Sequence, residues 1–568
     1  MASRTLRQSR LHSGGPRHGR RFGVALLLIV GLLPRLSSSA DWPQWGGSSH
    51  RNCLSSARQL PIDWDIKTGR NIAWTTKLGS SSLGGTVVAG DHIYVGTNNT
   101  QGFVERYPPT VDLGCLVCLD RETGEFIWQH SSEKLAIGRQ QDWPMLGIIS
   151  TPCVDGDRLW YVNNRAEVVC LDTDGFLDGA NDGSFQREPS AANDEADVVW
   201  QFDMRAILGV SPHNASVCSP TTDGERLFII TGNGVDESHV RIPAPQAPDF
   251  LCLDRDTGAI LWTDCPVGER LLHTSWSSPA YAVIRGVPMV LMGGGDGWLY
   301  AYDPAGDGAG GARLLWKFDC NPKSSKWQIG GRPDHCQRND YIATPVVVND
   351  RIYVRTGQDP EHGGGPAELW CIDPFANHLP EQPWSGADLS ATLVYSAMDN
   401  GQPVGVPLPP RRMQNLDVAA GEVEVPNPQS AVIWRFSGQD INGQDGIEFD
   451  ESMHRGLSSP TIAEGLLFIA DGEGILLCLE ADTGRLLWNH DLLANSYSTP
   501  LVADGRLYMT DEDGDVLVLA VAPEKRVLAE FEIGSSINCT AVACGETLYL
   551  LDRDRLHAIR ATDTAGCP

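Results

Sequence analysis

The 568-residue sequence has little positive charge. It holds 44 Lys and Arg residues against 72 Asp and Glu, which gives a formal net charge of −28. Seven of the Arg residues lie before residue 41, so a chain that starts after Ala40 keeps 37 basic residues and carries −35. Such a field repels phosphate backbones. No nucleic acid is therefore expected as a partner, and the charge favours cations or a partner with a basic patch.

The sequence also lacks the short motifs of several enzyme classes. No Gly-x-Ser-x-Gly, His-Glu-x-x-His or Gly-x-x-x-x-Gly-Lys occurs, which removes the usual evidence for a hydrolase or a nucleotide site. The Gly-rich segment 293–297 is expected to form a hairpin turn rather than a phosphate loop. The carboxylates of segment 511–515 suit calcium, but a hairpin turn is the preferred interpretation.

No apolar run is long enough to span a bilayer, although residues 23–33 form a short one. These eleven residues would cover about 16 Å as a helix, against a hydrocarbon core of about 30 Å. An Arg-rich segment precedes them and Ser37-Ser-Ser-Ala40 follows, a pattern typical of a secretory signal. An uncleaved anchor is the alternative. We expect export to the periplasm or the extracellular space without a transmembrane span in the mature chain, and outer-membrane association stays open.

A sequence repeat covers most of the remaining chain. It runs Ser/Thr-Pro, a turn, an alternating strand, a second turn, Cys-Leu-Asp, Thr-Gly and Trp, with its cleanest copy from Ser459 to Trp488. Asp-Gly pairs such as Asp504-Gly505 interrupt the apolar alternation, which indicates antiparallel hairpins. Each copy predicts four short strands, and such a unit repeated around a circle is a β-propeller blade.

The two ends of the repeated region predict the number of blades. Seven full copies are followed by three strands of an eighth, in residues 538–560, which lack the Trp-bearing strand. An unassigned strand of that kind, Asn71–Leu78, lies at the start. We therefore predict an all-β, eight-bladed propeller, closed by pairing of N- and C-terminal strands because closure removes two open sheet edges.

This interpretation divides the chain into five regions. Residues 1–40 are the expected signal peptide, 41–70 an N-terminal arm across the ring, 71–560 the propeller and 561–568 a tail. Residues 374–430, rich in Pro and polar residues, are expected to be a surface insertion in the fifth blade.

The fifteen cysteines in an expected exported chain first suggest disulfides. Five of them occupy one position of the repeat, however, and equivalent positions of different blades are too far apart to bridge. They are therefore predicted to be small core residues: Cys118, Cys170, Cys252, Cys371 and Cys478. Cys320 and Cys336, which flank a long loop between the fourth and fifth blades, are the pair predicted to be able to bond.

The repeats carry a family resemblance in their Trp-bearing turns. Asp120-Arg-Glu-Thr-Gly-Glu-Phe-Ile-Trp128, with the matching segments 254–262 and 480–488, resembles the docking motif of quinoprotein propellers. The chain therefore resembles the PQQ-like β-propeller repeat family. The family includes quinoprotein alcohol dehydrogenases and non-catalytic members such as BamB, so the resemblance implies the architecture and leaves the activity open.

Departures from the dehydrogenases favour the non-catalytic branch. The sequence has no Cys-Cys dipeptide and no Cys-x-x-Cys-His haem segment, and the calcium ligands and catalytic Asp of these enzymes have no assignable counterpart. It departs from BamB too, since no Cys follows the apolar segment to carry a lipid. The leading hypothesis is a non-catalytic envelope scaffold whose loop face binds a protein or polymer. The alternative is a dehydrogenase dependent on PQQ and calcium.

Loops that enter the innermost strands, and loops between the middle strands, converge at one mouth of a propeller channel. Trp276 could stack on a flat ring, and Arg455 could hold a carboxylate. His362 with Glu361, or His454 with Asp450 and Glu451, could bind a metal, although a hydrogen-bonded loop histidine is the more common case. No catalytic residue and no metal ligand is assigned. The cofactor-binding candidates at the mouth are Trp276, His273, His454, Arg455 and Asp340, with His213, Tyr497, Asp296 and Asp359 nearby.

Overall fold

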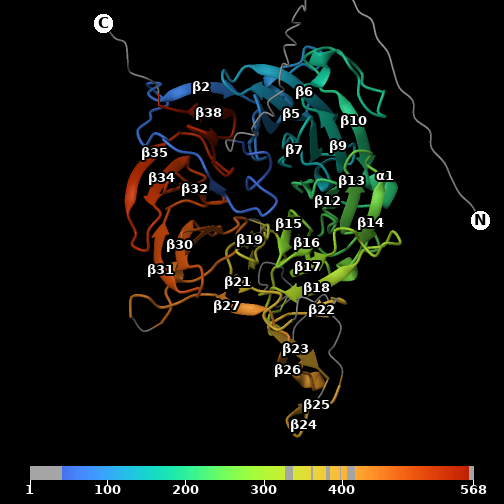
Figure 1. Ribbon diagram of the computed structural model, residues 1–568, viewed down its shortest axis with the longest axis vertical. Helices are drawn as coiled ribbons and strands as arrows, with labels where there is room; N and C mark the ends of the chain where they lie inside the picture. Colours follow the sequence, from blue (N-terminus) through green and yellow to red (C-terminus); the bar gives the residue numbers. More distant parts are fainter. Residues whose placement is uncertain are drawn as a thin grey trace, which may run out of the picture. The chain divides into compact units, whose positions relative to one another are not determined.

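Eight sheets follow one another around a ring in the computed structural model of the chain (Figure 1). The structure describes residues 41–326, 337–359, 362–378, 384–396, 398–405, 416–443 and 446–561. In each blade the first strand lies innermost, and its neighbours pair antiparallel outward. The predicted all-β, eight-bladed propeller of four-stranded antiparallel blades is confirmed.

Blades one to four use strands in simple chain order. Blade one holds β3 (Val87–Ala89), β4 (His92–Asn98), β5 (Leu113–Asp120) and β6 (Phe126–Glu133). Blade two holds β7 (Cys153–Asp155), β8 (Arg158–Val162), β9 (Glu167–Asp172) and β10 (Val198–Asp203). Blade three holds β11 (Thr221–Thr222), β12 (Arg226–Ile230), β13 (Phe250–Asp254) and β14 (Ile260–Asp264). Blade four holds β15 (Ala280–Ile284), β16 (Val287–Gly293), β17 (Trp298–Tyr302) and β18 (Leu314–Asp319).

Blades five to eight include an insertion and the chain ends. Blade five holds β19 (Val346–Val348), β20 (Arg351–Arg355), β21 (Leu369–Ile372) and β27 (Val432–Phe436). Blade six holds β28 (Thr461–Ala463), β29 (Leu466–Ala470), β30 (Ile475–Glu480) and β31 (Leu486–Asp491). Blade seven holds β32 (Leu501–Ala503), β33 (Arg506–Thr510), β34 (Asp515–Ala520) and β35 (Val527–Glu532). Blade eight holds β36 (Val542–Cys544), β37 (Thr547–Leu551), β38 (Arg555–Ile559) and, outermost, β2 (Ile72–Lys77).

The eighth blade joins segments from the two ends of the propeller. Strand β2 pairs antiparallel with β38, with Trp74 opposite Ala558 and Lys77 opposite Arg555. Trp74 thus takes the position that Trp128 has opposite Cys118 in the first blade.

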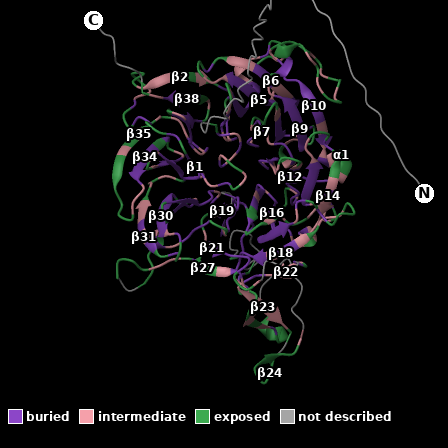
Figure 2. Ribbon diagram, in the orientation of Figure 1, coloured by how far each residue is buried: buried purple, intermediate pink, exposed green. Residues whose placement is uncertain are grey.

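The repeated Cys and Trp positions form the core between blades. All five cysteines of the series are fully buried, which confirms their predicted core role, and each pairs across its blade with the Trp of the outer strand, as Cys478 does with Trp488. The indole N–H groups of six Trp residues donate to backbone carbonyls of the following blade, at 3.0–3.3 Å. The strands of the blades are accordingly mostly buried, while intermediate and exposed segments also occur inside the ring (Figure 2).

The N-terminal arm touches the innermost strand of every blade, in chain order. The Trp42 N–H donates to Val88, Pro43 accepts from Val154, and Gln44 accepts from the Thr221 hydroxyl. The same order continues with Ser49 on Tyr281, His50 on Val347, Asn52 on Ile462, Cys53 on Val502 and Ser55 on Ala543. Strand β1 (Leu54–Ser55) also pairs parallel with β32.

Arg51 anchors the arm at the centre of the ring. Its side chain is fully buried and donates hydrogen bonds of 2.8–3.0 Å to the carbonyls of Trp45, Ser219, Pro220 and Pro279. Ser219, Pro220 and Pro279 directly precede the innermost strands β11 and β15, so Arg51 ties the arm to the entries of the third and fourth blades.

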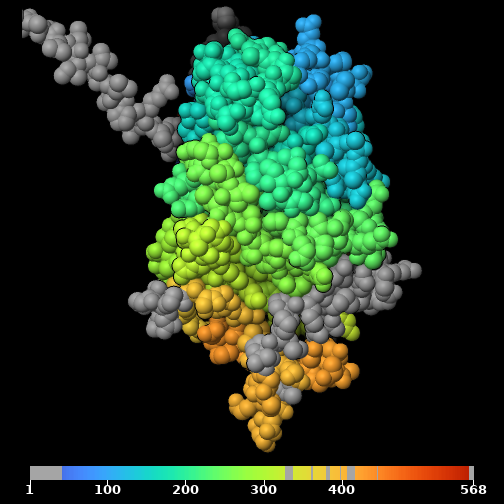
Figure 3. Space-filling view, turned by 90° about the vertical axis from the view of Figure 1, so that its right-hand side faces the viewer, coloured from blue at the N-terminus to red at the C-terminus, as the bar shows by residue number. Residues whose placement is uncertain are grey.

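The insertion in the fifth blade has two parts. Strand β22 (Ala387–Asp388) pairs parallel with β18 and adds a fifth strand to the fourth blade. Strands β23 (Thr392–Tyr395) and β26 (Val423–Pro426) form a ladder that projects from the edge of the ring with β24 (Met398–Asp399) and β25 (Gln402–Pro403) (Figure 3). The insertion is therefore partly buried as well as exposed, since Trp384 and Leu389 pack into the core of the fourth and fifth blades.

Helix is scarce in the described part of the chain. It comprises α1 (Met204–Leu208) and short 3-10 turns, among them Asn99–Gln101, Gly138–Gln140, Gly175–Asp178, Gly268–Arg270, Val418–Ala420 and Phe449–Glu451. Within the described ranges no helix has the length and apolar character needed to cross a bilayer. The predicted signal segment, residues 1–40, and the tail from residue 562 lie outside the described residues.

Candidate functional site

A cavity of about 560 Å³ lies beside the arm, at the loops that enter the innermost strands. It is lined mainly by residues that directly precede the innermost strands, such as Gly85, Thr151, Ser278 and Thr344. Trp45 of the arm also contributes to the lining, together with Trp143 and Trp276. Two kinds of loop lie on this side of the propeller: those that enter the innermost strands and those that join the second and third strands of a blade. We call this side the channel face.

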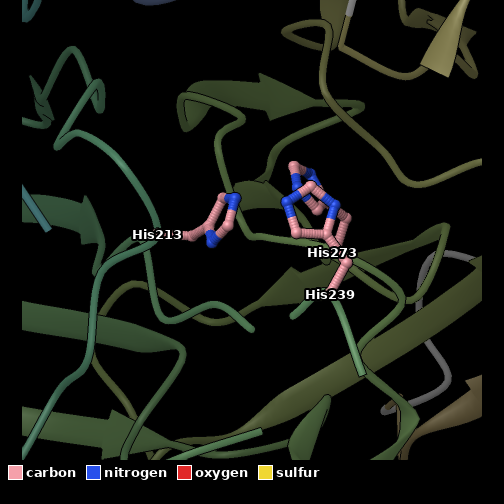
Figure 4. A group of neighbouring side chains, drawn as sticks. All are labelled: His213, His239 and His273. Atoms are coloured by element: carbon pink, nitrogen blue, oxygen red, sulfur yellow. The ribbon is translucent and has the colours of Figure 1, made fainter. Parts of the chain in front are cut away.

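Four histidines gather at the edge of this cavity. His213 precedes β11, His239 lies between β12 and β13, His273 precedes β15, and His362 lies between β20 and β21. The ring centroids of His213 and His273 are 4.5 Å apart, and those of His239 and His273 are 5.0 Å apart (Figure 4). The His273 and His362 centroids are 4.9 Å apart.

Local backbone geometry brings these loops together. Isolated β-bridges join Pro212 to Asn233 and Gly234 to Thr274. Gly234 has no room for a side chain, because a Cβ there would lie 2.5 Å from the Cβ of His213. His239 has a φ of 56°, a left-handed conformation uncommon for residues other than glycine.

Hydrogen bonds fix two of the four rings. His213 Nδ1 lies 2.8 Å from the Val235 carbonyl, so this nitrogen donates and carries the proton. His362 Nδ1 bonds to one oxygen of Asp359, while His273 Nδ1 lies 3.2 Å from the other oxygen. The Asp359 carboxylate therefore lies between two imidazole rings.

Burial and charge set the protonation of these groups. Burial lowers the pKa of His273 to about 3, even though the nearby Asp359 carboxylate opposes the shift, so His273 is neutral at neutral pH. Burial also lowers the pKa of His362, but the hydrogen bond to Asp359 outweighs it and the net shift is upward. Burial alone would raise the pKa of Asp359, yet His362 and His273 hold it below its usual value.

Asp340 lies in the same region, in the loop before β19. It is buried, and burial together with the Asp359 charge raises the pKa of its carboxyl to about 7. Its two oxygens have no hydrogen-bond partner among the described residues. The predicted candidates Asp340 and His273 thus both lie in this region.

Trp276 joins the histidines to the cavity, as expected for a residue at the channel mouth. It lines the cavity, its indole N–H donates to the Ala215 carbonyl at 3.1 Å, and its ring meets His273 edge-on at 5.6 Å. Tyr497 lines the cavity on another side.

His454 and Arg455 have structural partners instead. His454 Nδ1 bonds to Asp471 at 2.7 Å, and its ring stacks on Phe449. Arg455 donates to the Asn339 side chain and the His362 carbonyl, so it is held inside the wall rather than lining the cavity. Asp296 is similarly engaged with Arg270 and Tyr300.

Several other sequence expectations can be compared with the structure. The metal group around His454 is not formed, because Glu451 accepts backbone N–H groups of Ile441, Asn442 and Glu448. Segment 511–515 is a turn, as predicted, with Asp511 accepting from two backbone N–H groups within it. Glu361, and Cys336 of the predicted Cys320–Cys336 pair, lie outside the described residues.

The cavity lining does not fit PQQ. Asp359 and Glu512 are its charged side chains, and neither Lys nor Arg is among the described residues that line it. PQQ is a tricarboxylate, and an acidic lining repels it. The nearby imidazole nitrogens also differ from the oxygen ligands that calcium takes.

The fold and the cavity define a β-propeller with a ligand-sized site at one end of its channel. The family model described as outer membrane protein assembly factor BamB matches residues 48–130 and 419–563. The two matched stretches include the docking motifs at 120–128 and 480–488, so there the chain is similar to the PQQ-like β-propeller family that these motifs predict.

Solved propellers resemble the chain over most of its length. BamB from Moraxella catarrhalis is 12% identical, with 88% of this chain and 99% of that chain covered and a TM-score of 0.47. A europium-containing methanol dehydrogenase is 11% identical, with coverage of 90% and 89% and a TM-score of 0.40. The quinohemoprotein alcohol dehydrogenase from Comamonas testosteroni is 12% identical, with coverage of 93% and 82% and a TM-score of 0.39. No curated protein matches the chain.

Proposed function

We propose that the protein is an exported, non-catalytic propeller that binds a protein partner with a basic patch through its channel face. One observation carries the proposal: loops of this face expose nine large apolar side chains. They are Val111, Ile137, Met145, Ile207, Val240, Ile441, Ile447, Phe449 and Leu493.

The charge of the chain specifies the partner further. Exposed apolar side chains on loops supply contact area for a protein, and the net charge of −28 favours a basic one. The matching family model carries the description outer membrane protein assembly factor BamB, and this description supports a protein partner in the cell envelope. A segment of the partner could enter the cavity from the channel face, because the loops of this face supply most of the cavity lining.

A capture experiment with matched charge insertions tests the proposal. Leu493 is 87% exposed on the channel face, and Leu177 is 48% exposed on a loop of the opposite face. Wild-type protein and L177D should retain the same basic partner from envelope extracts, while L493D and F449D should lose it. The retained complex should dissociate as salt is raised.

Two results would count against this function. Equal capture by all four proteins would show that the channel face is not the binding surface. A stable PQQ and calcium complex that reduces a dye in the presence of alcohol would support the dehydrogenase alternative instead.

A further inference from the structure

The four-histidine cluster has the donor set of a transition-metal site. Two overlapping groups have ligand atoms within 4.8 Å of one another: His213 with His239 and His273, and His273 with Asp359 and His362. Zinc binds imidazole nitrogen at about 2.0–2.1 Å, which places nitrogens of a tetrahedral site about 3.4 Å apart. The ligand atoms therefore need to approach by up to about 1.4 Å, which side-chain rotations can supply.

One hydrogen bond of the cluster already orients His213, and a carboxylate lies close to His273. In metal sites a coordinating histidine donates its second nitrogen to a carbonyl or carboxylate, which fixes the ring. His213 donates Nδ1 to the Val235 carbonyl, and His273 directs Nδ1 toward Asp359. With Nδ1 directed in this way, Nε2 is the ring atom through which each histidine would coordinate a metal.

His273 supplies an independent indication of a ligand. Its side chain is about 97% buried, and neither ring nitrogen has a hydrogen-bond partner among the described residues, Asp359 being near but not aligned. A buried polar group without partners costs folding free energy, and a bound ion removes that cost. The left-handed backbone at His239 is a second local cost, of a kind that gathers at functional sites.

We propose that His213, His239 and His273 bind a divalent transition-metal ion, with Zn²⁺ the best fit. Asp359 acts as a positioning residue, held between His273 and His362. Three imidazole ligands leave one tetrahedral position for water or a ligand donor. Trp276 and Asp359 line the cavity beside the cluster, so this position is reached from the channel face. The site goes beyond the proposed partner binding and does not depend on it.

Metal titration of the chelator-treated full chain tests the site. Wild-type protein should bind about one Zn²⁺ per chain, and Co²⁺ in its place should give the visible bands of a tetrahedral site. H239A should weaken zinc affinity by about 100-fold or more without harm to folding, because His239 lies on a partly exposed loop. D359N should weaken it by about 10- to 100-fold.

Two controls separate this site from nonspecific binding. H490A removes a histidine of the outer strand β31, and zinc affinity should stay at the wild-type value. His557 is a buried histidine paired with Asp552 but outside the cluster, so D552N should also leave zinc affinity unchanged. Absence of stoichiometric binding in wild type, or equal affinity in wild type and H239A, would overturn the proposal.

Discussion

Gly484 of the sixth blade lies directly against the indole ring of Trp434 from the fifth blade. A Cβ at Gly484 would come within 2.6 Å of that ring, and the φ of this residue is +72°. Gly124 and Gly258 face Trp74 and Trp200 in the same way. The Thr-Gly and Trp elements of the repeat are therefore two halves of one contact between adjacent blades.

This contact predicts a specific cost for a methyl group. G484A should lower the free energy of unfolding by about 1–3 kcal/mol more than G505A does, since Gly505 has a φ of +70° but open space around it. Both variants share the backbone penalty, so the difference measured in urea reports the Trp434 contact. Equal losses would show that the indole moves aside freely.

The indole hydrogen bonds predict unequal effects of two Trp substitutions. Trp128 and Trp316 are both fully buried, but Trp128 Nε1 donates to the Thr173 carbonyl while Trp316 Nε1 has no partner among the described residues. W128F should therefore be about 1 kcal/mol more destabilising than W316F in chemical denaturation. The reverse order would contradict the docking role of the indole N–H.

The hydrogen bonds of Arg51 should make a measurable contribution to the attachment of the arm to the ring. R51A leaves the buried carbonyls of Ser219, Pro220 and Pro279 without their donor and should lower the free energy of unfolding by about 3 kcal/mol. R58A, a change at an exposed residue of the same arm, should have little effect. Protease cleavage within residues 41–60 should also become faster in R51A alone. A stable, resistant R51A would mean that the arm is held mainly by its backbone contacts.

Asp249 predicts a pH-dependent stability difference. Burial raises the pKa of its carboxyl to about 7, with the Asp296 charge adding to the shift. In the unfolded chain the same carboxyl ionises near pH 4, so wild-type stability falls as pH rises from about 4 to about 7. D249N lacks this loss, and its stability relative to wild type should rise over that range by up to a few kcal/mol. Unfolding at about pH 5 and about pH 8 measures it, and an unchanged difference would contradict the buried ionisation.

The repeat made the fold predictable because each blade encodes its own hairpins and docking contact. Asp-Gly pairs, the buried Cys position and the Trp-bearing strand recur in register, so Trp74 could be placed beside strands almost 500 residues away. The pairing of β22 with β18 carries no such pattern, since two residues of a polar insertion give no periodic signal.

The site was predicted only in part. His273, Trp276 and Asp340 were identified because they enter the channel mouth, but the histidine cluster was not, since its members come from loops without a shared motif. His213 and His273 do precede their Ser-Pro steps by similar distances, which is the signal that could have linked them. The position of His239 in the cluster depends on its left-handed backbone conformation, for which the sequence has no recognisable pattern.

The order of the arm contacts has a consequence for biosynthesis. Because residues 42–55 meet the blades in sequence from the first to the eighth, the earliest part of this region to leave the ribosome is among the last to find its native surroundings. The arm can therefore complete its contacts only after the eighth blade has been synthesised. The bound arm connects all eight blades, so we expect its detachment to be an early step in unfolding of the ring.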